Sequence, residues 1–148
     1  MKIYLASDHA GFSLKKEIAA YLYKQGYEIE DCGDYAEDNN DDYPDFISVA
    51  AKKVSENPDS KAIVFGKSGS GEEIVANKFK NVRAILGFSA ENVKLARQDN
   101  DANLLALGSQ FVDEQKAIEL VKVFLETPFS NEERHKRRID KIKEIENG

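Results

Sequence analysis

A glycine-rich segment, Gly66-Lys67-Ser68-Gly69-Ser70-Gly71, is followed by two glutamates and points more directly to chemistry than any other part of the sequence. Glycines allow a positive φ and let backbone N–H groups approach a ligand. A helix that starts directly afterwards adds donors that favour negative charge. The Gly-Lys-Ser/Thr ending of a P-loop is missing, and Glu72 stands where a dinucleotide fingerprint would hold phosphates. A tight turn whose acidic residues complement the helix dipole is the alternative.

An anion-binding turn that holds a carboxylate suits aldose–ketose isomerisation. This reaction needs a base that removes a proton from the carbon beside a carbonyl, and donors that hold the enediolate oxygens. Glu72 is the candidate base, and Ser68 could carry a proton between the two oxygens. The amides of Gly69, Ser70 and Gly71 are the candidate oxyanion hole.

Asp8 and His9, directly after the first apolar run, are the second candidate. Response regulators place phosphoacceptor acids at that position, but they also need a lysine after the fifth strand, where this chain has Gly108-Ser109-Gln110. A Ser/Thr-rich flavin-phosphate loop is absent as well. A purely structural role for His9, as a helix cap or loop brace, is the alternative.

The segment Arg134-His135-Lys136-Arg137-Arg138 is a basic cluster in an otherwise acidic chain. At helical spacing Arg134, Arg137 and Arg138 share one side, which makes a phosphate clamp plausible. A solvated helix face is the alternative, and most charge runs are of that kind.

Short apolar runs alternate with helical patterns and would position these residues. Strands are expected at 3–6, 27–30, 62–65, 82–86 and 104–107, and helices at 12–25, 46–54, 71–77, 90–97, 114–125 and 131–145, with a long acidic loop at 31–45. Short apolar strands of this kind are buried on both faces of a parallel sheet. The sequence therefore predicts a three-layer α/β/α Rossmann-like fold with a five-stranded parallel sheet and an extra C-terminal helix. Ligands of such sheets bind at the carboxyl ends of the strands, where Asp8 and the glycine-rich segment fall.

Composition limits the remaining possibilities. A length of 148 residues favours a single domain over 1–148, and the net charge of −6 argues against a nucleic-acid partner. Cys32 is the only cysteine, so no internal disulfide or cysteine-based metal site can form. The N-terminus lacks a signal-peptide pattern, and no apolar run reaches the ~20 residues of a membrane span. We therefore expect a cytoplasmic protein with no membrane partner.

Five segments together resemble ribose-5-phosphate isomerase B and the related galactose-6-phosphate isomerases. They run in family order over nearly the whole chain: Ser7–Phe12, Asp42–Asp45, Gly69–Lys78, Asn100–Asn103 and Arg134–Asp140. One branch of this family uses a cysteine at the end of the third strand as its base, where this chain has Gly66. The other branch uses a glutamate at the start of the following helix, which falls on Glu72.

The resemblance implies roles for further residues. Ser68 and the amides after it would form the anion hole, and Asp8, His9, Tyr43 and Asn100 would contact the sugar. Arg134, His135 and Arg138 would bind the phosphate across a dimer interface, so a homodimer is the expected functional unit, with pairing into a tetramer left open. No metal or organic cofactor is expected.

Two positions depart from the family pattern. A histidine thought to help open the furanose ring is replaced by Asp99, and an arginine after the fifth strand is replaced by Gln110. A carboxylate can act as a general base but is a poor proton donor near pH 7 unless its pKa is raised. The leading hypothesis is interconversion of D-ribose 5-phosphate and D-ribulose 5-phosphate through a cis-enediolate, with Glu72, Ser68 and Asp99 as catalytic residues. An isomerase of another phosphorylated sugar and a non-catalytic sugar-phosphate-binding protein are the alternatives.

Overall fold

The computed structural model describes residues 1–148, along which five strands alternate with helices. The strands are β1 (Lys2–Ser7), β2 (Glu28–Asp31), β3 (Lys61–Gly66), β4 (Ala84–Leu86) and β5 (Leu104–Gly108). The helices are α1 (Phe12–Lys24), α2 (Tyr43–Glu56), α3 (Ser70–Ala76), α4 (Ala90–Asn100), α5 (Glu114–Glu126) and α6 (Glu133–Asn147). None of these helices is both long and apolar enough to cross a membrane.

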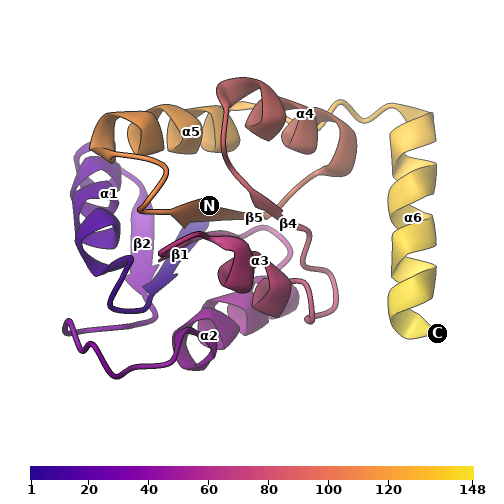
Figure 1. The fold of residues 1–148 in the computed structure, drawn as a ribbon. Coiled ribbons are helices and arrows are strands. Elements are labelled where there is room, and N and C mark those ends of the chain that lie inside the picture. The colour runs from indigo at the N-terminus through magenta and orange to yellow at the C-terminus, as the bar shows by residue number, and fades with distance from the viewer.

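The five strands form one parallel sheet in the order β2-β1-β3-β5-β4. Helices α4 and α5 lie above the sheet in Figure 1 and α2 and α3 lie below it, while α1 packs with α5. The predicted three-layer α/β/α fold with a five-stranded parallel sheet is thus confirmed, and α6 is the extra C-terminal helix.

Successive side chains along the strands point to opposite faces of the sheet, and they divide the core into one part with large side chains and one with smaller ones. Towards α1 and α5 the central strands present large side chains, among them Ile3, Leu5, Ile63, Phe65, Leu105 and Leu107. Towards α2 and α3 the same strands present smaller ones, among them Ala6, Ala62, Val64 and Ala106. Because successive side chains point to opposite faces, each of the central strands β1, β3 and β5 contributes to both cores and is buried on both sides.

Some boundaries differ from the predicted ones. Helix α2 begins at Tyr43, within the predicted loop, because a proline in the first helical turn, here Pro44, is favourable. Helix α4 extends to Asn100, three residues beyond its predicted end. The fourth strand is shorter than predicted, since Val82 donates to the carbonyl of Phe79 in a turn that precedes it.

Opposite edges of the sheet carry different parts of the chain. Strands β1, β3 and β5 end at the edge from which α3 begins, whereas α4 and α5 end at the edge where strands begin. Helix α6 stands apart at that second edge, on the right of Figure 1. Only two of its residues, His135 and Ile139, are buried in this chain.

Candidate active site

The loops after β1, β3 and β5 are joined to one another by hydrogen bonds at the carboxyl edge of the sheet. The hydroxyl of Ser109 donates to the carbonyl of Ala10 at 2.9 Å, and its amide donates to the carbonyl of Gly66 at 2.8 Å. Gln110, next to it, donates its amide to the carbonyl of Lys67 at 3.0 Å. The three strand ends therefore form a single platform.

Glu72 lies in the first turn of α3 and its side chain points into this platform. The residue is 3% exposed, and a Cβ built on Gly66 would fall on its carboxyl group. The carboxylate thus fills the space that a side chain at the end of β3 would need. A side chain at position 66 would therefore require the Glu72 carboxyl group to move.

Burial raises the pKa of Glu72 above that of an ordinary glutamate, because desolvation penalises the charged form. The negative charge of Asp8 raises it further, and backbone N–H groups of Glu72 and Gly69 oppose the shift. Asp8 is itself 7% exposed and accepts a hydrogen bond from the amide of Gly11 at 3.2 Å. Two buried carboxylates, one after β1 and one in the first turn of α3, therefore lie close enough for their charges to interact.

The glycine-rich loop packs tightly around Glu72. Gly69 precedes α3 with a φ of 83°, a left-handed conformation that favours glycine. The hydroxyl of Ser68 accepts the amide of Ser70 at 3.2 Å, so one of the three predicted oxyanion-hole amides has a partner within the chain. A Cβ on Gly71 would lie 2.6 Å from the ring of Tyr43, so the tyrosine at the start of α2 packs directly on this loop.

His9 forms a pair with Asp41 that the sequence analysis did not identify. Its Nδ1 lies 2.6 Å from Oδ1 of Asp41, and its amide donates to the same oxygen at 3.2 Å. Ligand atoms of Asp8, His9 and Asp41 lie within 4.8 Å of one another, but a cation could use this Nδ1 only after breaking the hydrogen bond. No sequence signal marked Asp41, since it is one of several acidic residues in a loop 32 positions away.

The remaining predicted site residues lie elsewhere in the chain. Asp99 and Asn100 form the last turn of α4, and Asp99 Oδ1 is 3.3 Å from Nε2 of His135 on α6. Arg134 is exposed and lies near Glu132 at 3.5 Å, whereas Arg138 is exposed and forms no ion pair within the chain. This half of the predicted site is therefore centred on the contact between α4 and α6.

A strand length separates the two halves within one chain. Asn100 precedes β5 and Glu72 follows β3, so they lie at opposite edges of the sheet, and five or six residues of strand span about 15–20 Å. Because α4 continues to Asn100, the segment after Arg97 does not fold back towards Glu72. A single chain does not bring Asp99 or the basic cluster to the predicted base.

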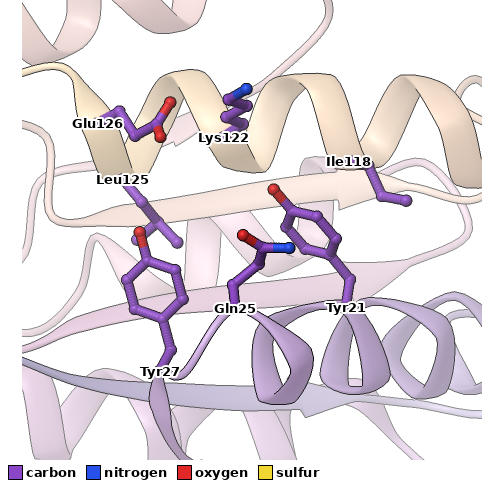
Figure 2. A pocket seen from close by; sticks show the side chains of 7 residues that line it. All are labelled: Tyr21, Gln25, Tyr27, Ile118, Lys122, Leu125 and Glu126. Atoms are coloured by element: carbon purple, nitrogen blue, oxygen red, sulfur yellow. The ribbon is translucent and has the colours of Figure 1, made fainter.

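A cavity of about 340 Å³ lies between the C-terminal ends of α1 and α5 (Figure 2). Figure 2 shows the rings of Tyr21 and Tyr27 rising from the α1 side towards Lys122 and Glu126 on α5. Burial raises the pKa of Tyr27, and the charge of Glu126 adds to the shift. None of the lining residues belongs to either half of the candidate site.

The fold and the carboxyl-edge loops define a class of protein: a three-layer parallel α/β protein whose candidate reaction centre is a buried glutamate beside a glycine-rich loop. The model of the ribose/galactose isomerase family matches residues 3–142. The chain belongs to this family.

Similar proteins cover the chain almost completely. A ribose-5-phosphate isomerase B of Mycolicibacterium paratuberculosis is 44% identical over 146 residues, which is 99% of this chain and 92% of that protein. The crystal structure of ribose-5-phosphate isomerase B from Mycoplasma genitalium with bound ribulose 5-phosphate is 42% identical, with a TM-score of 0.95 over 99% of this chain and 96% of that one. The enzyme of Clostridium thermocellum is 39% identical, with a TM-score of 0.95 over 99% and 98% of the two chains.

Proposed function

We propose that the protein interconverts D-ribose 5-phosphate and D-ribulose 5-phosphate. Full-length relatives named ribose-5-phosphate isomerase B, one of them solved with ribulose 5-phosphate, support this assignment. Within this chain, the observation that supports the assignment most directly is the buried carboxylate of Glu72. Glu72 lies at the start of α3, and its carboxylate fills the space beside Gly66.

In the proposed reaction Glu72 removes the proton from C2 of the open-chain aldose and returns it to C1. The electron pair of the broken C–H bond forms the C1–C2 double bond of a cis-enediolate, while the π pair of the C1 carbonyl moves onto O1. A proton moves from O2 to O1 when the ketose forms, and from O1 to O2 in the reverse reaction. Ser68 is the residue assigned to that oxygen-to-oxygen transfer. Amides at the start of α3 stabilise the negative oxygen, and the raised pKa makes Glu72 a stronger base than an ordinary carboxylate.

We also assign the phosphate site to a second copy of the chain. Arg134 and Arg138 are exposed on α6, at the opposite edge of the sheet from Glu72 (Figure 1), so a homodimer with each α6 extended over its partner's carboxyl edge would complete two sites. Guanidinium groups suit phosphate because they donate several charge-assisted hydrogen bonds. In the same assembly His135 would assist the phosphate contact, and Asp99 and Asn100 would reach the sugar.

We also propose a cytoplasmic location, which the state of the single cysteine supports. Cys32 is buried and burial raises its pKa to about 11, so the thiol is protonated and unreactive at neutral pH. Oxidising compartments favour disulfide bonds, and a single unreactive thiol cannot form one within the chain.

Kinetics with a panel of sugar phosphates test the proposed function. We expect turnover of ribose 5-phosphate and ribulose 5-phosphate well above that of hexose 6-phosphates. Glu72→Gln, purified in parallel, should lower kcat by about 10²–10⁴-fold with KM largely retained, because only the base is lost.

Glu73→Gln is the matched control for this measurement. Glu73 Oε2 accepts the amide of Leu86 at 2.7 Å, so its carboxylate is already used to hold β4 and should leave kcat within a few-fold of wild type. Full activity in Glu72→Gln would move the base elsewhere. Turnover confined to another sugar phosphate would refute the pentose assignment.

A further inference from the structure

The contact between His9 and Asp41 joins two loops that border the candidate site. Asp41 lies in the acidic loop before α2, and its side chain is only 6% exposed although the loop is on the surface. One oxygen accepts both the ring Nδ1–H and the backbone amide of His9. The other oxygen is buried and has no hydrogen-bond partner, so His9 is the only group that compensates this carboxylate.

We propose that Asp41 is a positioning residue for substrate binding: it holds the His9 ring by Nδ1, so that Nε2 is the single ring nitrogen left for the sugar phosphate. This inference rests on the proposed function for the identity of the ligand. The pairing itself is a property of the folded chain and can be measured without turnover.

The ring geometry leaves one nitrogen for a ligand. An imidazole has two nitrogens, and the partner of one determines which role the other can play. With Nδ1 committed at 2.6 Å, only Nε2 can reach a substrate, and the His9 side chain is 34% exposed. A cationic Nε2–H donates to an anionic or sugar oxygen, whereas a neutral ring with the proton on Nδ1 offers only an acceptor there.

The charges around His9 favour the cationic ring. The hydrogen bond that His9 donates to Asp41 raises the pKa of His9, the charges of Asp8, Asp41 and Asp38 add to the shift, and partial desolvation opposes it. These three carboxylates come from the loop after β1 and the loop before α2. A sugar phosphate would bring further negative charge to this acidic loop, so a positive ring at its centre also reduces repulsion.

Histidine NMR tests the pairing directly. The chain has only two histidines, so the ring C–H signals of His9 and His135 can be assigned with His9→Gln. In Asp41→Asn the His9 titration midpoint should move to lower pH while that of His135 stays in place. Asp38→Asn, which removes the same charge from the same loop without touching the ring, should move it less. An unchanged His9 midpoint in Asp41→Asn would overturn the proposal.

Kinetics then test whether the site uses the pairing. Asp41→Asn keeps a ring acceptor but loses the charge, so its KM should be close to wild type at an acidic pH, where the ring is protonated in both proteins, and higher at a more alkaline pH, by up to about tenfold, with kcat within a few-fold. Asp41→Ala loses the acceptor too and should raise KM at both pH values. A KM within about twofold of wild type for both variants at both pH values would overturn the positioning role.

A double-mutant cycle separates this role from a general effect of the loop. If Asp41 acts through His9, Asp41→Asn should add nothing to the KM of His9→Gln. Additive effects would overturn the proposal. If neither pentose phosphate is turned over by the wild type, the proposed function fails while the NMR titration still decides the pairing.

Discussion

At Glu72 the requirement for a base conflicts with the requirement for a stable fold. A carboxylate that is 3% exposed has lost most of its hydration, and the nearby charge of Asp8 adds repulsion. Both effects penalise the ionised form, which is also the form that removes a proton from carbon. Strained or desolvated groups of this kind are common at reaction centres, and replacing them often stabilises the fold.

Glu72→Gln should therefore gain stability relative to wild type as the pH rises. The folded-state pKa of Glu72 is above its unfolded value, so the unfolded chain binds fewer protons in that window and wild-type stability falls as the pH increases through it. The Tm difference between Glu72→Gln and wild type should be smallest below pH ~4, the ordinary range of glutamate, and largest at neutral pH. Thermal unfolding of both proteins across this range measures it.

Glu73→Gln again provides the comparison, because its carboxylate is bonded to the amide of Leu86 and is less buried. It should show no such gain at neutral pH. A Tm difference for Glu72→Gln that stays constant from acid to neutral pH would contradict the desolvation argument.

At the scale of elements, short α3 depends on its neighbours. A helix of seven residues is not stable alone in water. Glu73 bonds the amide of Leu86, and the Asn77 side chain bonds both the amide and the carbonyl of Ala84, at 2.8 and 3.0 Å. These contacts attach α3 to strand β4, and so they hold the first turn that carries Glu72.

The contact between α4 and α6 places Asp99 beside His135. We expect Asp99→Asn to lower the initial rate with ribose 5-phosphate by at least ~10-fold and with ribulose 5-phosphate by less than ~3-fold, because the aldose must first leave its closed furanose form. Asp99→His should retain the ribose 5-phosphate rate. Initial rates in both directions measure the effect.

Glu132→Gln is the control for the charge that surrounds His135. Glu132 Oε2 lies 3.6 Å from the same His135 nitrogen, so this variant changes the surroundings of His135 without removing Asp99. Equal losses for the two sugars in Asp99→Asn would assign Asp99 to binding or to structure.

At the scale of the whole molecule, the two halves of the site lie at opposite edges of the sheet. The half that contains Glu72 depends on the ends of β1, β3 and β5, and the half that contains Arg138 depends on α6, which buries only two residues in its own chain. In the proposed symmetric dimer, the first half of each chain would lie beside the second half of its partner, which would complete two sites.

Mixing Glu72→Gln and Arg138→Ala chains should restore activity that neither variant has alone. After random exchange half of the dimers are hybrids, each with one intact site, so about a quarter of wild-type activity is expected. Mixing Glu72→Gln with Ser68→Ala, both in the same half, should restore none. Absence of rescue in the first mixture, once subunit exchange is verified by mass, would argue against a shared site.

Features that depend on neighbouring positions could be predicted from the sequence. Alternating apolar runs predicted the parallel α/β sheet, and the contiguous segment from Gly66 to Glu72 predicted a carboxylate at a helix start, because such patterns depend on contacts a few residues apart. The start of α2 was predicted too late because Pro44 indicates a turn as readily as a first helical turn.

Only the tertiary structure decided which distant residues meet. The strand order and the pairing of His9 with Asp41 arise from packing between loops and strands far apart in the chain. The close approach of the Glu72 carboxyl group to Gly66 likewise depends on how α3 packs against the end of β3. Each of the many acidic residues of the loop before α2 has the same chemistry, and only the folded path of that loop selects Asp41. The candidate base and its glycine-rich loop were thus predicted from local spacing, whereas their geometry depends on long-range packing that a linear pattern does not encode.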